Sequence, residues 1–217
     1  MAVRALLAEL AREHERRSGV AVRVESVGGV DAERRVSEGE AFDFVVLARD
    51  AIDRLAASGR VDPGSRVDVA RSGMAVAIRR NLPHPGVASE SQVRDAVIVA
   101  RKIGFSTGPS GRHLMALLER WGIAGEMQSR LVQAPPGVGV GSLVARGDAD
   151  LGFQQASEFQ GVDGIDVLGP LPDPIQSTTV FAGAVCAAAK DPAAARDFLA
   201  FACSGEAAGA RQRQGMS

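Results

Sequence analysis

The sequence contains no tyrosine, one tryptophan and eight phenylalanines in 217 residues. So few aromatic rings argue against base-stacking platforms and aromatic sugar-binding clefts. The formal net charge is −1 and there is no long basic run, which argues against a nucleic-acid partner. No apolar stretch approaches the roughly 20 residues needed to span a bilayer. We therefore expect neither nucleic-acid binding nor membrane insertion.

Cysteine and histidine are also scarce. Cys186 and Cys203 stand in apolar surroundings, where each is expected to be a small buried side chain, and a disulfide between them is the less favoured alternative. His14, His84 and His113 are scattered without metal-ligand spacing. The sequence therefore predicts no metal site and no cofactor.

The first residues do not have the pattern of a signal peptide. A basic stretch followed by an apolar run is missing from residues 1–17, whose apolar positions repeat at helical spacing instead. This pattern predicts an amphipathic helix that buries one face. The chain could be a mature or trimmed form, and a cytosolic location stays open. The expected buried face consists of Val3, Leu6, Leu7, Leu10 and Ala11.

With 46% hydrophobic and 24% charged residues, the chain can bury a sizeable core. Strand and helix patterns alternate over its first third, which predicts a largely parallel sheet. Breaks rich in proline follow at 79–86 and 170–178, on either side of a second α/β pattern. We predict one domain from residues 1–79 and 179–217, with residues 80–178 inserted as a second. The expected strands are 20–25, 42–47, 74–78, 103–105, 131–133, 149–153 and 178–186, and the expected helices include 31–37, 140–146 and 191–203.

The segment from Phe105 to Gly122 indicates a strand end, a loop of small residues and then a helix. Such a turn leaves backbone N–H groups at the positive end of a helix dipole, where an anion can bind. The hydroxyls of Thr107 and Ser110 add donors, and Arg112 adds a fixed charge. An ordinary helix start without a ligand is the competing interpretation.

Taken in order, motifs along nearly the whole chain resemble bacterial solute-binding proteins of ABC transporters, in the molybdate-binding-like branch. The resemblance implies an α/β fold of the type II periplasmic-binding class, with two Rossmann-like lobes joined by two crossover segments. It also implies a small anion captured in an interlobe cleft, an ABC permease as partner, a periplasmic location and a monomer. The matching segments are 5–22, 42–59, 71–78, 108–113, 143–153 and 191–208.

The chain departs from that family pattern in two places. Met1 falls where the family's first strand should be finishing. Molybdate binders of the family also tend to use a tyrosine after the segment that ends here at Phe153, and this chain has Gln154 and Gln155 instead. Because arginine binds carboxylates through two hydrogen bonds, we expect an organic carboxylate before a molybdate-type oxyanion.

The candidate ligand-binding residues follow from the helix-start argument and from the matched positions. They lie at strand ends, at helix starts and in a glycine-rich loop that is not a P-loop, since no Gly-Lys-Ser/Thr follows it. The set is Ser110, Gly111, Arg112, Thr107, Arg71, Ser72, Ala48, Gln154, Gln155 and Gly137.

Two other functions compete with transport. The fold family includes isomerases of unsaturated tricarboxylates such as aconitate, which need a base near an acidic carbon. His113 and Glu158 are the titratable candidates for that role, although a histidine placed like His113 is more often a simple surface or core-edge residue. A ligand-sensing domain of a cytosolic regulator is the third alternative, but no convincing helix-turn-helix segment accompanies it.

Overall fold

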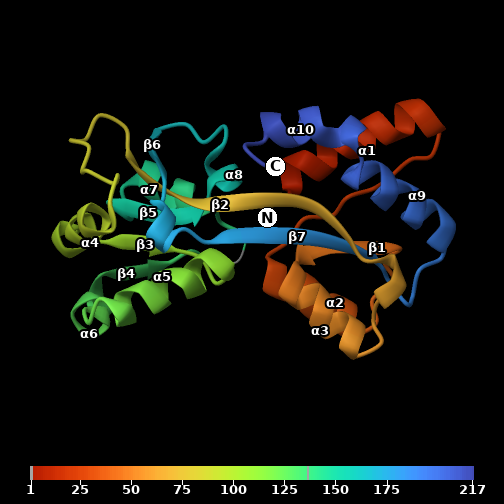
Figure 1. Ribbon diagram of the computed structural model, residues 1–217, viewed down its shortest axis with the longest axis horizontal. Helices are drawn as coiled ribbons and strands as arrows, with labels where there is room; N and C mark the ends of the chain where they lie inside the picture. Colours follow the sequence, from red (N-terminus) through yellow and green to blue (C-terminus); the bar gives the residue numbers. More distant parts are fainter. Residues whose placement is uncertain (1, 136) are drawn as a thin grey trace. The chain divides into compact units, whose positions relative to one another are not determined.

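The computed structural model of the protein describes residues 2–135 and 137–217 and divides the chain into two compact units (Figure 1). Unit 1 comprises the residues up to Ser72 together with Thr179–Ser217, and unit 2 is Gly73–Thr178. The sequence predicts the first boundary between the two domains after residue 79. In the structure this boundary falls after Ser72, inside strand β2 (Val67–Arg79), which runs unbroken from one unit into the other.

Unit 1 is built on the antiparallel pair β1–β7, in which Phe44 faces Val185 and Ala48 faces Phe181. Strand β7 in turn lies beside β2. Helices α1, α9 and α10 pack on one face of these strands, and α2 and α3 pack on the other. The elements are α1 (Arg4–Ser18), α2 (Gly29–Ser37), β1 (Phe44–Ala48), α3 (Arg49–Ala57), η1 (Pro63–Ser65), β7 (Thr178–Val185), α9 (Pro192–Cys203), η4 (Gly205–Ala207) and α10 (Ala208–Arg213).

The amphipathic pattern of α1 is confirmed, since all five predicted residues are buried. Leu6 and Leu10 pack into the same core as Phe198 of α9. Helix α9 begins as its sequence predicts, with Pro192 in its first turn and the Asp191 side chain accepting a hydrogen bond from the Ala194 N–H at 3.0 Å.

The strand expected at residues 20–25 is not formed. The side chains of Val22 and Val24 are half-buried against the core while Arg23 is exposed, so the alternation is real. No strand pairs with this segment among the described residues, however, and an extended chain without a ladder is not a strand. The largely parallel sheet is also wrong for unit 1, because its β1–β7 pair is antiparallel.

Unit 2 carries a mixed sheet in the order β2-β5-β3-β4, with β6 beside β2. Strand β3 runs parallel to β4 and β5, whereas β2 is antiparallel to both β5 and β6. The elements are α4 (Glu90–Val99), β3 (Ile103–Phe105), α5 (Pro109–Arg120), α6 (Ala124–Met127), η2 (Gln128–Arg130), β4 (Leu131–Gln133), α7 (Val140–Arg146), β5 (Leu151–Gln155), α8 (Ala156–Phe159), β6 (Ile165–Pro170) and η3 (Asp173–Ile175).

Alternate side chains of β2 face opposite layers of unit 2, as expected for a strand buried on both faces. Met74 and Val76 pack with α4, α5 and α6. Ala75 and Ala77 pack with α7 and α8. The sheet is therefore covered on both sides, and polar groups of the unit reach solvent at the ends of its strands.

The two cysteines differ from each other. Cys186 is buried, and this burial, with a smaller contribution from the charge of Asp43, raises the pKa of its thiol to about 11. Cys203 is exposed, contrary to the sequence prediction, because it ends α9 on the side away from Phe198 and Ala202. Both thiols are free.

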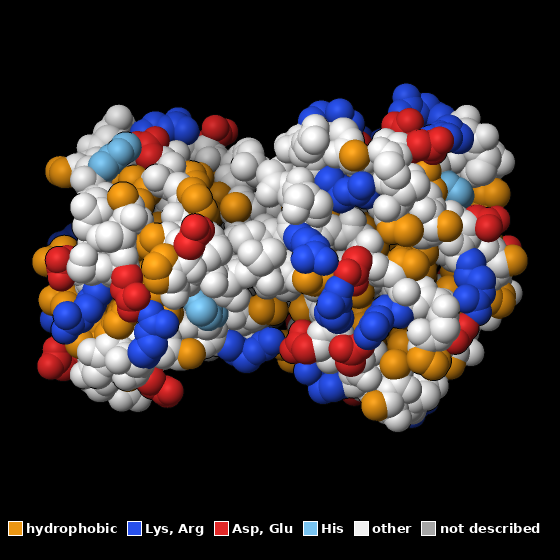
Figure 2. Space-filling model, viewed as in Figure 1, with side chains coloured by type: hydrophobic (Ala, Val, Ile, Leu, Met, Phe, Trp, Pro, Cys, Tyr) orange, Lys and Arg blue, Asp and Glu red, His pale blue; other side chains and the backbone are white. Residues whose placement is uncertain are grey.

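The surface of unit 1 carries many ion pairs. Figure 2 shows acidic and basic side chains side by side over α2 and α3, where Arg54 contacts Glu33 and Asp50 and Arg34 contacts Glu38. These side chains are largely exposed, so each pair contributes little stability. No helix within the described residues has the length and apolar character required to cross a bilayer.

Candidate functional site

Three neighbouring strands of unit 2 end at one edge of the sheet. Strands β3, β4 and β5 are parallel, with Phe105 beside Gln133 and Gly104 beside Gly152. The carboxyl ends of parallel strands are where loops and helix starts converge on ligands. This edge carries the loop after Phe105, the loop after Gln133 and the end of β5 at Gln155.

Helix α5 begins at this edge with an open N-terminal turn. Gly108 is its N-cap residue and provides no side-chain hydrogen bond, and no acidic residue stands in the first turn. The first N–H groups of a helix have no acceptor within the helix. Because Pro109 has none, these groups belong to Gly108, Ser110 and Gly111. They point out of the helix at the positive end of its dipole.

Gly111 is required by the tight fit of this turn. A Cβ atom at position 111 would lie 1.6 Å from the carbonyl oxygen of Ser106, which is far closer than any contact allows. The Ser110 side chain is 1% exposed, and its hydroxyl lies 3.2 Å from the Ser106 hydroxyl. The loop is thus held against the helix start by backbone packing and by a buried hydroxyl pair.

The remaining predicted residues of this motif differ in their surroundings. Thr107 and Arg112 are exposed at the loop and on the first turns of α5. His113 is half-buried, and its Nε2 lies 2.8 Å from the carbonyl oxygen of Ile175. Since a carbonyl only accepts, Nε2 carries a proton and donates it. This bond ties α5 to the segment η3, and it leaves only Nδ1 of His113 to act as a base.

Gln154 connects two elements at the same edge. Its Oε1 accepts a hydrogen bond from the Val140 N–H at the start of α7, at 2.8 Å. Its side-chain amide donates to the Glu158 carboxylate. Burial raises the pKa of the Glu158 carboxyl, and the hydrogen bond from Gln154 opposes that rise. Gln154 therefore caps the first turn of α7 with its side-chain oxygen.

Gln155 and Gly137 complete the set in unit 2. Gln155 is the last residue of β5 and its side chain is 2% exposed. Gly137 has a φ of 77°, in the left-handed region that favours glycine, and an added Cβ would meet nothing within 4 Å. It lies in the loop between β4 and α7, whose neighbouring Pro136 is outside the described residues.

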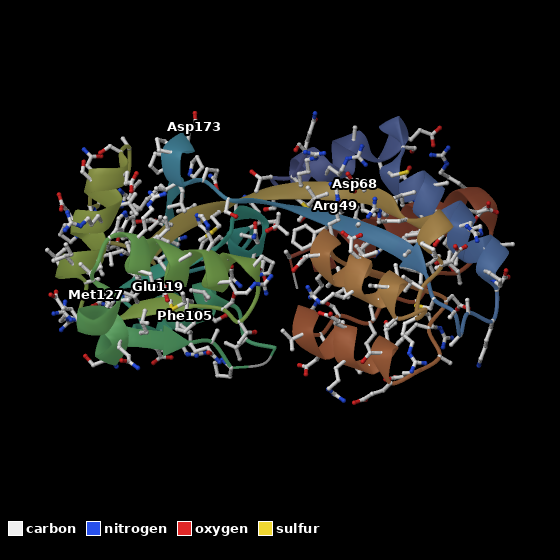
Figure 3. The ribbon with its side chains drawn as sticks, turned by 60° about the horizontal axis from the view of Figure 1, so that its bottom comes forward. Arg49, Asp68, Phe105, Glu119, Met127 and Asp173 are labelled. Atoms are coloured by element: carbon white, nitrogen blue, oxygen red, sulfur yellow. The ribbon has the colours of Figure 1, made fainter. Side chains whose placement is uncertain are left out.

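Three predicted residues lie in unit 1. Ala48 ends β1, and the next residue, Arg49, contacts Asp68 (Figure 3). Asp68 also faces Arg71, with an N–O distance of 3.8 Å between the side chains. One carboxylate thus lies beside two guanidinium groups, and this end of β1 has a net positive charge. Ser72 follows on β2 and is 2% exposed.

Within residues 2–135 and 137–217, no group of three or more His, Cys, Asp and Glu side chains is arranged to hold a metal ion. The polar groups at this edge are N–H groups, hydroxyls and amides, together with the Glu158 carboxyl bonded to Gln154.

Two contacts of unit 2 could not be predicted from the sequence. The hydrogen bond between Gln154 and the Val140 N–H joins residues that are close only after folding. Likewise, the Gln176 amide bonds with the backbone of Met74 at 2.8 Å and 3.1 Å, beside Gly73. No spacing rule connects positions so far apart along the chain.

The sheet of unit 2 is covered on both faces, and unit 2 is inserted between two segments of unit 1. This arrangement is that of a two-unit protein of the periplasmic-binding class. The chain belongs to the family of bacterial extracellular solute-binding proteins, whose pattern matches residues 1–217. An aconitate isomerase from Pseudomonas sp is 36% identical to the chain over 185 residues, which is 84% of this chain and 70% of that protein.

Solved structures of periplasmic binding proteins share the fold. The periplasmic molybdate-binding protein of Azotobacter vinelandii superimposes with a TM-score of 0.83 at 21% identity, covering 100% of this chain and 95% of the other. The substrate-binding domain of a molybdenum ABC transporter from Clostridium difficile gives 0.73 at 17% identity, with 100% and 94% covered. PEB3 with bound L-phospholactate gives 0.75 at 14% identity, with 99% and 95% covered. The predicted fold class is therefore confirmed.

Proposed function

We propose that this protein binds a small organic carboxylate at the start of α5 and delivers it to an ABC permease in the periplasm. The observation that carries the proposal is the open N-terminal turn at Gly108, packed against the Ser106 carbonyl at the edge where three parallel strands end. Its N–H groups and the positive dipole end attract an anion. Family membership supports the capture of a solute.

A carboxylate is favoured over a tetrahedral oxyanion by the side chains around the turn. Arg112 is exposed beside it, and a guanidinium pairs with a planar carboxylate through two parallel hydrogen bonds. The neighbours named for molybdate suggest a molybdate-type oxyanion as the alternative ligand, and PEB3, whose structure holds L-phospholactate, supports an organic acid.

Isothermal titration with trans-aconitate, citrate, malate, molybdate and sulfate tests the proposal. We expect at least one tricarboxylate to bind and to raise the melting temperature, because a ligand that binds only the folded state stabilises it. The trimethyl ester of the same acid is the matched neutral control and should not bind. Absence of binding by every anion would contradict the proposal, and tight binding of molybdate alone would correct the ligand class.

A second candidate function is isomerisation of an unsaturated tricarboxylate. The relative named aconitate isomerase, at 36% identity, favours it. In such a reaction a base removes a proton from the carbon next to a carboxylate, and a proton returns to the far carbon of the double bond, so no electrons are gained or lost. Glu158 fits the base, since burial brings the pKa of its carboxyl closer to neutral pH.

Incubation of the protein with trans-aconitate, followed by chromatography of the acids, distinguishes the two functions. Formation of cis-aconitate by the unaltered chain, and its loss in Glu158→Gln with binding retained, would establish the isomerase. Binding without any conversion at high protein concentration would leave capture and delivery as the function.

A further inference from the structure

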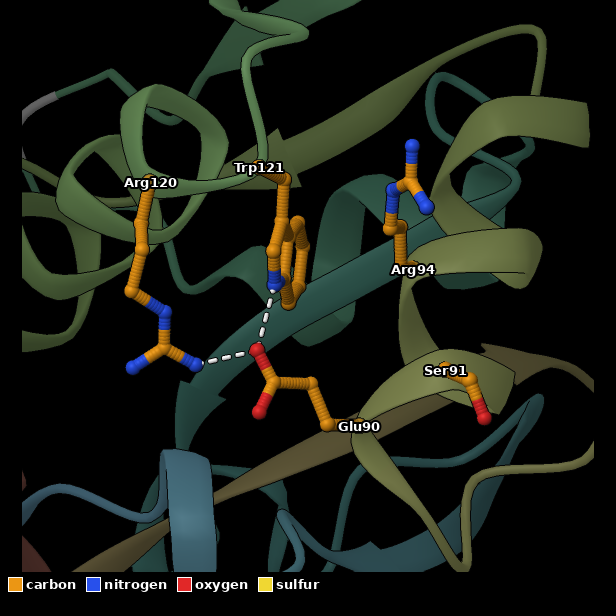
Figure 4. Close-up of a pocket in the computed structure, with 5 residues that line it drawn as sticks. All are labelled: Glu90, Ser91, Arg94, Arg120 and Trp121. Atoms are coloured by element: carbon orange, nitrogen blue, oxygen red, sulfur yellow. Dashed lines mark hydrogen bonds and ion pairs between the residues drawn. The ribbon is translucent and has the colours of Figure 1, made fainter.

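A pocket in unit 2 lies between the start of α4 and the end of α5. It has a volume of about 400 Å³ and is lined by Glu90, Ser91, Arg94, Arg120 and Trp121 (Figure 4). Helix α5 has 12 residues, so the pocket is about 18 Å along the helix from Gly108. It is separate from the open turn described above.

The acidic group of the pocket already has two partners. One oxygen of Glu90 accepts hydrogen bonds from the Trp121 indole N–H, at 2.8 Å, and from the Arg120 guanidinium. The hydrogen bonds from Trp121 and Arg120 lower the pKa of the Glu90 carboxyl, so the group is ionised at neutral pH. Glu90 therefore joins the start of α4 to the end of α5, and its charge is offset by Arg120.

Arg94 differs from Arg120 in having no such partner. It lies one helical turn after Glu90 on α4 and is exposed, and no described residue forms a hydrogen bond or ion pair with it. The two arginines and one glutamate give the pocket a net charge of +1. The chemistry of the lining is therefore suited to an anion that Arg94 can hold with its two-pronged guanidinium.

Trp121 supplies an apolar surface in the same pocket. Its indole is half-buried against the core of unit 2, and in Figure 4 the ring lies between the Arg120 and Arg94 side chains. A flat apolar body can stack on an indole face while a carboxylate pairs with a neighbouring arginine. We propose that this pocket binds a small aromatic or conjugated carboxylate, with Trp121 stacking on its ring and Arg94 binding its carboxylate.

Trp121 is the single tryptophan of the chain, and there is no tyrosine, so the emission comes from a residue that lines this pocket. Benzoate is the probe, and benzamide is its uncharged counterpart of the same shape. In the unaltered protein we expect a saturable change of emission with benzoate and none with benzamide at the same concentration.

Three variants complete the test. Arg94→Gln should weaken benzoate binding at least tenfold. Circular dichroism of this variant is the check that the exposed substitution leaves the fold intact. Arg146→Gln, an exposed arginine on α7, and Arg112→Gln, at the start of α5, should leave the response unchanged. An equal response to benzamide, an unchanged response in Arg94→Gln, or its loss in Arg112→Gln would each overturn the proposal. The last result would assign benzoate to the open turn of α5 instead.

Discussion

The N-terminal turns of α4 and α5 lie in the same unit and are built in opposite ways. At α4 the Ser89 hydroxyl accepts from the Gln92 N–H at 3.3 Å, the Gln92 side chain reaches back to the Ala88 N–H at 2.8 Å, and Glu90 stands in the first turn. At α5 the N-cap residue is Gly108, which has no side chain to accept a hydrogen bond, and no acidic residue stands in the first turn. The chain satisfies the start of α4 with its own side chains, whereas the N-cap residue of α5 provides no side-chain hydrogen bond.

The difference suggests a way to find candidate anion sites, namely helix starts that lack side-chain caps. Serine at the N-cap with glutamine three residues later is the common solution for a helix start, and α4 uses it with Ser89 and Gln92. Helix α5 has serines nearby, but Ser110 is buried against Ser106 and does not cap. Four substitutions, taken from the largest expected effect to the smallest, test this contrast.

Replacement of Gly111 by alanine should have the largest effect. The new Cβ would meet the Ser106 carbonyl at 1.6 Å, so the loop and α5 must separate. We expect a loss of about 3 kcal/mol or more in the free energy of unfolding, together with loss of carboxylate binding. Chemical denaturation measures the first and calorimetry the second.

Gly125→Ala is the matched control, since a Cβ at that position meets nothing within 4 Å. It should leave both stability and binding near those of the unaltered chain. Equal stability of the two variants would show that the turn at Gly111 can relax without cost, and the tight packing would then not explain the glycine.

Much of this contrast could be predicted from the sequence, and some of it could not. The small-residue loop and a helix after Gly111 were predicted because glycine, proline and an apolar repeat are local signals, and in the structure the helix begins earlier, at Pro109. The sequence did not predict that residues 20–25 form no strand or that β1 and β7 are antiparallel, because strand pairing joins residues far apart along the chain. The capping of α7 by Gln154 was missed for the same reason.

Gly108→Asp would convert the start of α5 into one that resembles α4. The backbone at Gly108 has a φ of −77°, which any residue can adopt, and a Cβ there would contact the Ser106 hydroxyl at an ordinary 3.6 Å. The new carboxylate should cap the Ser110 and Gly111 N–H groups and repel an anionic ligand. We expect carboxylate affinity to fall about tenfold or more, by about 1.4 kcal/mol, with no loss of stability. Unchanged affinity in the titration would place the ligand elsewhere.

Ser89→Ala applies the reverse change to α4. It removes the acceptor for the Gln92 N–H, so we expect the free energy of unfolding to fall by about 1 kcal/mol. Carboxylate binding at α5 should not change, because nothing at Gly108 depends on Ser89. Ser91→Ala, which removes an exposed hydroxyl from the same turn, should be closer to neutral in the same denaturation experiment. A loss of binding in Ser89→Ala would mean that the two helix starts are coupled.

Glu158→Gln should have the smallest effect on stability, and the size of that effect depends on pH. Burial raises the pKa of this carboxyl in the folded state above its value of about 4.3 in the unfolded chain. At a pH above about 4.3 the carboxyl therefore ionises more readily in the unfolded chain, and this lowers the free energy of unfolding. Below that pH the group is neutral in both states and the penalty vanishes. Glutamine keeps an oxygen that can accept from Gln154 and carries no charge. The variant should therefore melt above the unaltered protein at pH 7.5, and the difference should shrink at pH 4. A difference of the same size at both pH values would mean that packing around Gln154, and not charge, determines the environment of this residue.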